Sequence, residues 1–143
     1  MDKRELFYKL VSFTASVHRV TNELTKDVKS DSISQVQYNI LENIAVGHPV
    51  TPSEINDCLN MSMPNTSREL RKLIEKGLIE KITDTEDRRK QYIRLSDNGK
   101  KMMNEAFASI ESRFFDRIQN ASTEELKEIE HAMAILQAKV FSQ

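Results

Sequence analysis

The 143-residue sequence has few of the residues that catalytic and metal sites usually need. It contains one cysteine, Cys58, so an intramolecular disulfide is excluded. Its three glycines form no phosphate-binding loop, and no nucleophile motif is present. The three histidines, His18, His48 and His131, lack the spacing of a zinc site. We therefore expect a protein that is not an enzyme and that holds no metal or cofactor.

Long hydrophobic runs are also absent. No stretch approaches the roughly 18 apolar residues of a membrane-spanning helix, and the start MDKRELFYK lacks the apolar run of a signal peptide. A single cysteine suits a reducing compartment. These absences predict a cytoplasmic protein that does not enter a membrane.

Positive and negative charges nearly balance over the whole chain, but not within each part of it. The net charge is -1, with 30% of the residues charged and 38% hydrophobic. Residues 62–101 hold eleven Lys or Arg against seven Asp or Glu, whereas the rest of the chain has ten basic against fifteen acidic residues. The middle of the chain is therefore basic and its flanks are acidic, which favours a polyanionic partner for the middle.

Both ends of the chain carry apolar stripes at helical spacing. Spacings of three and four residues predict amphipathic helices within residues 1–32 and within residues 100–143. Such stripes need a partner, which is either the rest of the same chain or, as the length of the first helix favours, a second copy. The residues predicted at this dimer interface are Leu6, Leu10, Phe13, Val17, Leu126, Ile129, Met133, Leu136 and Val140.

Residues 33–99 carry the signals of short helices followed by a hairpin. Ser34 with Gln37 and, further on, Ser62 mark helix starts, and Gly77 marks a helix end. Two alternating segments, LIEKIT and QYIRL, follow, joined by a charged segment that is too long for a two-residue turn. This order is typical of a winged helix-turn-helix. We therefore predict a mainly α fold with a small β-wing, forming a single domain of residues 1–143 with dimerisation helices at both ends.

The helix after Ser62 and the hairpin tip carry the candidate DNA contacts. An α-helix fits the major groove of a duplex, and an extended charged tip reaches the neighbouring minor groove. If Thr66, Leu70 and Leu73 face inward, the helix presents a polar and basic face outward. At the tip, Asp87 is close enough along the chain to orient the guanidinium of Arg89. The candidate contacts are Ser62, Pro64, Asn65, Arg68, Arg71, Lys72, Asp87, Arg88, Arg89 and Lys90.

The chemistry of these side chains suggests separate roles. Asn65 suits the paired donor and acceptor of adenine, and Arg68 suits guanine, whereas Arg71 and Lys72 suit phosphates. An isolated run of charge is usually only a solvated surface. Its position directly after a helix-turn-helix favours a DNA contact instead.

Four segments resemble the multiple-antibiotic-resistance-regulator (MarR) family of bacterial transcription factors. They are ISQVQYNIL at 33–41, SEINDCL at 53–59, LIEKGLIEK at 73–81 and DRRKQYIRLSDNG at 87–99. The last matches the family's wing pattern, and the resemblance covers nearly the whole chain. It implies a homodimeric, ligand-responsive regulator, usually a repressor, which binds a pseudo-palindromic operator in double-stranded DNA. It also adds Ser67 to the recognition helix, whereas the stretch Met63-Pro64-Asn65 departs from the family's small hydroxyl residues.

Three alternatives stay open at this stage. The winged unit can instead serve as a protein-interaction module on a helical scaffold. Cys58 is either a redox switch, as in some relatives, or a small packed residue, which the usual burial of free cysteines and its neighbour Asp57 favour. The resemblance also implies a small phenolic or carboxylate effector, in a cleft that His18 or Tyr38 either lines or merely packs beside.

Overall fold

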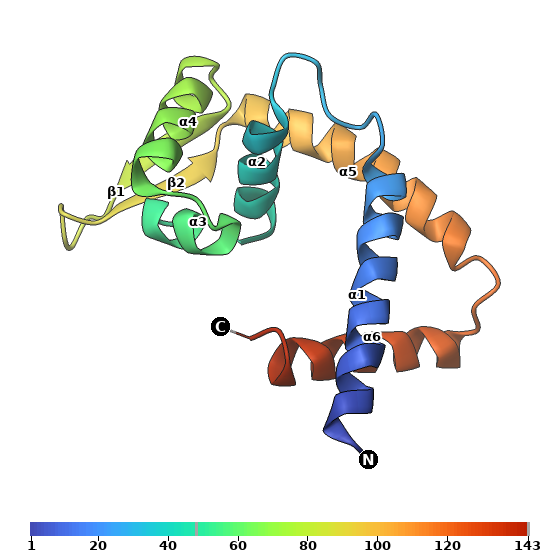
Figure 1. The fold of residues 1–143 in the computed structure, drawn as a ribbon. Helices are drawn as coiled ribbons and strands as arrows, with labels where there is room; N and C mark the ends of the chain where they lie inside the picture. Colours follow the sequence, from blue (N-terminus) through green and yellow to red (C-terminus); the bar gives the residue numbers. More distant parts are fainter. Residues whose placement is uncertain (48, 143) are drawn as a thin grey trace. The chain divides into compact units, whose positions relative to one another are not determined.

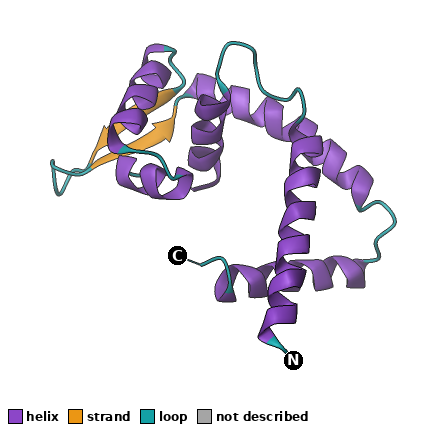
Figure 2. Cartoon of the chain, viewed as in Figure 1, coloured by secondary structure: helices purple, strands orange, loops and turns teal. Residues whose placement is uncertain are grey.

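The computed structural model describes residues 1–47 and 49–142, and the chain divides into two compact units, Met1–Ile110 and Glu111–Gln143. His48, one of the three histidines considered above, lies outside the described residues. The expected mainly α fold with a two-stranded wing is confirmed (Figure 2). In chain order the elements of Figure 1 are α1 (Lys3–Thr25), α2 (Gln35–Gly47), α3 (Pro52–Leu59), α4 (Met63–Glu75), β1 (Ile79–Thr83), β2 (Gln91–Leu95), α5 (Asp97–Arg117) and α6 (Thr123–Lys139).

Side-chain caps fix where the helices of the winged unit begin. At the start of α2, the Gln37 amide donates to Oγ of Ser34, and the Ser34 amide donates to Oε1 of Gln37, both over 3.1 Å. At the start of α4, Oγ of Ser62 accepts from the Asn65 amide over 3.2 Å. Each bond satisfies an amide that the helix itself leaves without a partner. The predicted starts of both helices are confirmed.

The hydrophobic core lies among α2, α3, α4, the hairpin and the first turns of α5. Leu41, Ile55, Leu73 and Ile93 come from four of these elements, and each is 0% exposed. Val50, just before α3, makes two backbone hydrogen bonds to the hairpin. The Ile93 amide donates to the Val50 carbonyl over 2.7 Å, and the Val50 amide donates to the Ile93 carbonyl over 3.1 Å. This core fixes α4 and the hairpin relative to each other, which matters because both carry candidate DNA contacts.

The hairpin has a long tip, as its sequence predicts. β1 and β2 pair antiparallel, with Ile79 opposite Leu95 at the base and Thr83 opposite Gln91 at the outer end. Residues 84–90 connect the two strands, and Figure 1 shows this tip extending beyond α3 and α4. The tip is therefore free to reach a ligand that α4 also contacts.

Two glycines shape the chain around the hairpin base. Gly77 has φ +74°, and the Leu78 amide donates to the Leu73 carbonyl over 3.0 Å, which closes α4 as predicted. Gly99 lies in the first turn of α5 against the backbone of Leu78, where a Cβ would sit 2.0 Å from the carbonyl oxygen. Only glycine allows α5 to start this close to the hairpin.

The outer helices end at defined residues. α1 falls within residues 1–32 as predicted and ends at Thr25, and Asp27 just beyond it has φ +58°, a left-handed conformation that a helix cannot pass through. α6 ends at Lys139, so Val140 is its C-cap and not a helical residue. Although α1 is long, no helix in the described part of the chain is apolar enough to cross a bilayer.

Candidate nucleic-acid interface

The outward face of α4 is polar and basic. Thr66, Leu70 and Leu73 are buried as predicted, which leaves the opposite side of the helix in solvent. On that side, Nη2 of Arg68 donates to Oδ1 of Asn65 over 2.6 Å, so the two residues expected to read bases are joined to each other. The other candidates of this helix are also exposed, namely Ser62, Pro64, Ser67, Arg71 and Lys72.

A hydrogen-bond network joins α4 to the start of α2. Nε2 of Gln37 donates to Oε2 of Glu69 over 3.1 Å. Nζ of Lys76 donates to Oε1 of Gln37 over 3.0 Å and to the Ser32 carbonyl over 2.7 Å. Glu69 also accepts from Nζ of Lys72 over 3.5 Å. These bonds fix the rotation of α4, and sequence reasoning found neither Glu69 nor Lys76 because the partners lie far apart in the chain.

The first turn of α4 rests on a buried residue of α3. Asn56 is 8% exposed, and its Nδ2 donates to Sδ of Met63. Met63 opens α4 directly after its cap, while most of its side chain remains in solvent. Met63, one of the residues that depart from the family pattern, therefore contacts Asn56 of α3.

The wing tip holds one arginine in a fixed orientation. Oδ1 of Asp87 accepts from the backbone amide of Arg89 over 3.0 Å and from its Nε over 3.1 Å. Nη2 of Arg89 lies 3.4 Å from Oδ2, so both carboxylate oxygens face the guanidinium. These bonds from Arg89 hold the pKa of Asp87 below its ordinary value, and the pair therefore persists at neutral pH. The predicted orienting contact between Asp87 and Arg89 is confirmed.

The tip itself is closed by backbone bonds. The Lys90 amide donates to the Asp87 carbonyl over 3.0 Å, and the Asp84 amide donates to the Lys90 carbonyl over 3.1 Å. Arg88, Arg89 and Lys90 are all exposed on this closed tip. The wing thus presents three cations on an ordered turn.

The predicted dimerisation residues lie on α1, on α6 or at the C-cap of α6, and neither helix has a buried residue. On α1, Phe13 and Val17 are 47% and 46% exposed, and on α6 Met133 is 57% exposed. The other predicted members are also exposed or only half-buried: Leu6, Leu10, Leu126, Ile129, Leu136 and Val140. Other exposed apolar side chains of α1, α5 and α6 are Phe7, Tyr8, Val11, Phe114, Phe115 and Ile135.

The expectation that Cys58 is a packed residue is wrong, because Cys58 is exposed on α3. The core side of this short helix is taken by Ile55 and Asn56, and Cys58 projects away from them. Among the described residues, no three His, Cys, Asp or Glu side chains gather as metal ligands.

The two candidates for an effector cleft have different surroundings. His18 is exposed on α1, whereas Tyr38 is 4% exposed in α2. Burial of the phenol, together with the nearby Glu42 carboxylate, raises the pKa of Tyr38 to about 12. Tyr38 lines a cleft of about 270 Å³ that also contains Lys29 and Glu105. The Lys29 ammonium there already donates to two backbone carbonyls, so this cleft offers little to an anion.

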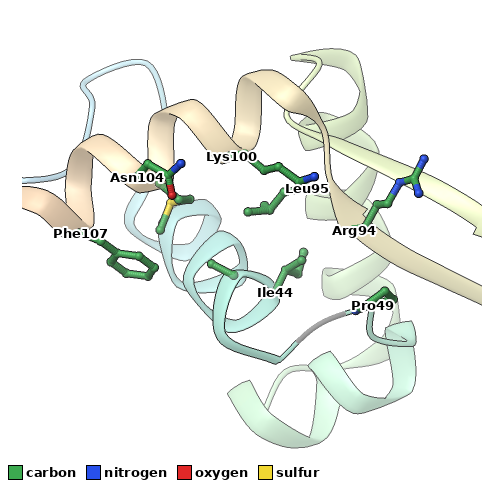
Figure 3. A pocket seen from close by; sticks show the side chains of 9 residues that line it. Ile44, Pro49, Arg94, Leu95, Lys100, Asn104 and Phe107 are labelled. Atoms are coloured by element: carbon green, nitrogen blue, oxygen red, sulfur yellow. The ribbon is translucent and has the colours of Figure 1, made fainter.

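A second cleft, of about 440 Å³, lies between the end of α2, β2 and the first turns of α5. Figure 3 shows Lys100, Asn104 and Phe107 coming from α5 to line it, with Ile44 of α2 across from them. Arg94 also lines the cleft, but its guanidinium points away, and its Nε donates to Oε2 of Glu80 over 2.9 Å. The cleft therefore combines an apolar wall with the ammonium of Lys100 and the amide of Asn104.

Residues 32–90 match the model of the MarR family. Over 132 residues the chain is 29% identical to an uncharacterised HTH-type transcriptional regulator, YdgG, of Bacillus subtilis, and the match covers 91% of this chain and 84% of the relative. That relative is named as a regulator and not as an enzyme, which agrees with the expectation from the sequence.

Two solved structures have a similar fold. Staphylococcus aureus MarR in complex with salicylate and kanamycin superposes with a TM-score of 0.71 at 22% identity, covering 97% of this chain and 95% of that one. A mutant of Escherichia coli MarR complexed with operator DNA gives a TM-score of 0.57 at 19% identity, covering 90% of this chain and 96% of that one. At these identities the likeness establishes the fold, which is that of a winged helix.

Proposed function

We propose that this chain, which is similar to transcriptional regulators of the MarR family, is a ligand-responsive repressor that binds a pseudo-palindromic operator as a homodimer. The α4 helix of each subunit enters the major groove of one half-site, and the wing tip reaches the adjacent minor groove. The residues assigned to DNA are Ser62, Pro64, Asn65, Ser67, Arg68, Arg71, Lys72, Asp87, Arg88, Arg89 and Lys90.

One observation carries the proposal: the cations of the basic middle segment are held outward on ordered elements. Arg68 is bonded to Asn65 on a helix anchored at both ends, and Arg89 is bonded to Asp87 on a closed turn. Cations held in this way lose little freedom when they meet phosphates or base edges.

Selection of bound duplexes from a random pool tests the function directly. We expect enrichment of an inverted repeat whose half-sites lie about one helical turn, roughly 34–36 Å, apart. Transcription in vitro from a promoter that overlaps the selected sequence is expected to fall when the protein is added. Enrichment of no duplex would reject DNA binding, and a rise in transcription would reject the repressor role.

The apolar stripes of α1 and α6 support the homodimer. Phe13 on α1 and Met133 on α6 are each about half exposed in the single chain, and monomeric proteins rarely leave apolar stripes of this kind in water. A second copy of the chain supplies equivalent stripes, as two-fold symmetry requires.

Truncation of Ile129 on α6 is expected to weaken the dimer. Ile129→Ala removes apolar contact area from both subunits, so the dissociation constant should rise about tenfold, or about 1.4 kcal/mol. Light scattering over a concentration series measures the change. Lys127→Ala, on the same helix but outside the stripe, should leave the constant unchanged. Equal constants for both variants would remove α6 from the interface.

The residues that line the cleft around Lys100 support the proposal that the protein binds a small carboxylate effector. Its apolar wall suits an aromatic ring, and its ammonium and amide suit a carboxylate. The structural relative from Staphylococcus aureus was solved with salicylate, which combines these two features. We assign the effector to this cleft, beside the start of α5 and the end of β2.

Salicylate is a suitable probe of this assignment. It should release the selected duplex from the wild-type protein, and Lys100→Gln should raise the concentration needed for half release about fivefold, because a charge-assisted hydrogen bond is lost. Fluorescence anisotropy of the labelled duplex measures the release. Lys101→Gln, which removes a neighbouring charge that does not line the cleft, is the control. Identical titrations for the two variants would contradict the assignment.

A further inference from the structure

A groove separates α4 from the hairpin, on the side of the winged unit that carries both candidate DNA contacts. Its volume is about 420 Å³. Ser67, Arg71 and Ile74 line it from α4, and Lys81, Gln91 and Ile93 line it from the two strands. Of these six residues, sequence reasoning had assigned only Ser67 and Arg71 to DNA.

The register of the hairpin explains why Lys81 faces this groove. Residues directly opposite each other in an antiparallel pair share one face of the sheet. Lys81 is opposite Ile93, and Ile93 is completely buried against the helices. Lys81 therefore lies on the same face as the core and level with Ile93, but on the outer strand, because Val50 flanks β2 on its other side. Gln91, opposite Thr83, continues this face outward.

The charge of the groove is unbalanced. Among the described residues, no carboxylate lines it, and neither Arg71 nor Lys81 belongs to an ion pair. Lys72, Arg89 and Arg94 of the basic segment do have carboxylate partners. Arg94, on the opposite face of the same hairpin, pairs with Glu80 over 2.9 Å, and Lys72 of α4 lies 3.5 Å from Glu69. Two cations without a carboxylate therefore meet in the groove between α4 and the wing.

We propose that this groove binds one phosphate group of the DNA backbone, held by Arg71, Lys81 and Gln91. The proposal rests on the function proposed above, in which α4 occupies the major groove and the tip occupies the adjacent minor groove. The sugar-phosphate backbone is what separates two adjacent grooves of a duplex, so it must pass between α4 and the wing. Guanidinium, ammonium and amide donors suit phosphate oxygens, and this contact fixes register without reading sequence.

Lys81→Gln tests the proposal through the salt dependence of binding. Loss of one phosphate contact in each half-site should reduce the slope of log K against log salt by about 0.9 per subunit, which weakens binding about fivefold per subunit at 0.15 M salt and hardly at all near 1 M. The same factor is expected for the selected duplex and for an unrelated one. Lys101→Gln, which removes an exposed lysine of α5 that does not line the groove, should keep the wild-type slope. A purely structural role for Lys81 would leave the slope unchanged.

Neutral methylphosphonate groups locate the contact. Each methylphosphonate is placed singly along the selected duplex, and at several positions it should weaken binding by the wild-type protein. At the position that faces the groove in each half-site, the same replacement should no longer weaken binding by Lys81→Gln. If the wild-type protein binds the duplex, and Lys81→Gln has the same salt slope and the same methylphosphonate sensitivity as the wild type, the phosphate site alone would be overturned. Failure of the wild-type protein to retain any duplex would overturn the proposed function as well.

Discussion

Replacing Gly99 by alanine is expected to destabilise the winged unit by about 3 kcal/mol or more. The added Cβ would lie 2.0 Å from the carbonyl oxygen of Leu78, which is a backbone atom and cannot rotate away. To relieve the clash, the first turn of α5 must move from the hairpin base. That movement breaks the bond of 3.0 Å from the Ser96 amide to the Leu78 carbonyl, and it disturbs the Ser96 hydroxyl that caps α5. Urea unfolding followed by circular dichroism, at one fixed protein concentration, measures the loss.

Two other substitutions separate the clash from a general effect of alanine. Gly77→Ala meets no atom within 4 Å, so its cost is only that of a left-handed backbone, about 1 kcal/mol. Asn98→Ala changes an exposed neighbour of Gly99 and should fall within about 0.5 kcal/mol of the wild type. If Gly99→Ala were no more costly than Gly77→Ala, the close approach of α5 to Leu78 would not hold in solution.

The position of Gly99 illustrates which parts of the fold a sequence can specify. Local signals predicted the elements: Ser34 with Gln37 and Ser62 gave helix starts, and alternation gave the hairpin. These features depend on neighbours within four residues, so the sequence contains all the information. The reason for Gly99 depends on Leu78, twenty-one positions earlier, and only the packed structure brings the two together.

The candidate interface divides in the same way. The outward face of α4 followed from helical period, and the bond between Asp87 and Arg89 followed from their spacing. Lys81 was missed because its strand reads as an alternating segment, and nothing local indicates that it is the outer strand. Exposure of Cys58 was missed for a related reason, since the tilt of the short helix α3 on the core decides which of its sides is buried.

Arg89→Ala is expected to have the largest effect on DNA binding. The loss should be about thirtyfold per subunit, or about 2 kcal/mol, at physiological salt, because an oriented guanidinium at the wing tip suits the narrow, strongly negative minor groove. The salt slope should also fall, since a charge is lost. Anisotropy titrations of the selected duplex between 0.05 M and 0.5 M salt measure both quantities. Arg94→Ala removes an arginine from the same hairpin that is paired with Glu80 away from the tip, and it should bind nearly as the wild type does.

Asp87→Ala separates the charge of Arg89 from its orientation. The variant keeps the guanidinium but removes both carboxylate oxygens that hold it, so binding should weaken less than in Arg89→Ala, and the salt slope should stay at the wild-type value. The pH dependence follows from the lowered pKa of Asp87. The folded pKa lies below the unfolded one, so the pair is fully formed above the ordinary pKa of an aspartate and is lost only as pH falls through the lowered value. Between pH 6 and 8 the ratio of wild-type to Asp87→Ala affinity should therefore be constant. If Asp87→Ala bound DNA as tightly as the wild type, the ion pair would be incidental to recognition, and the charge of Arg89 alone would account for its contribution.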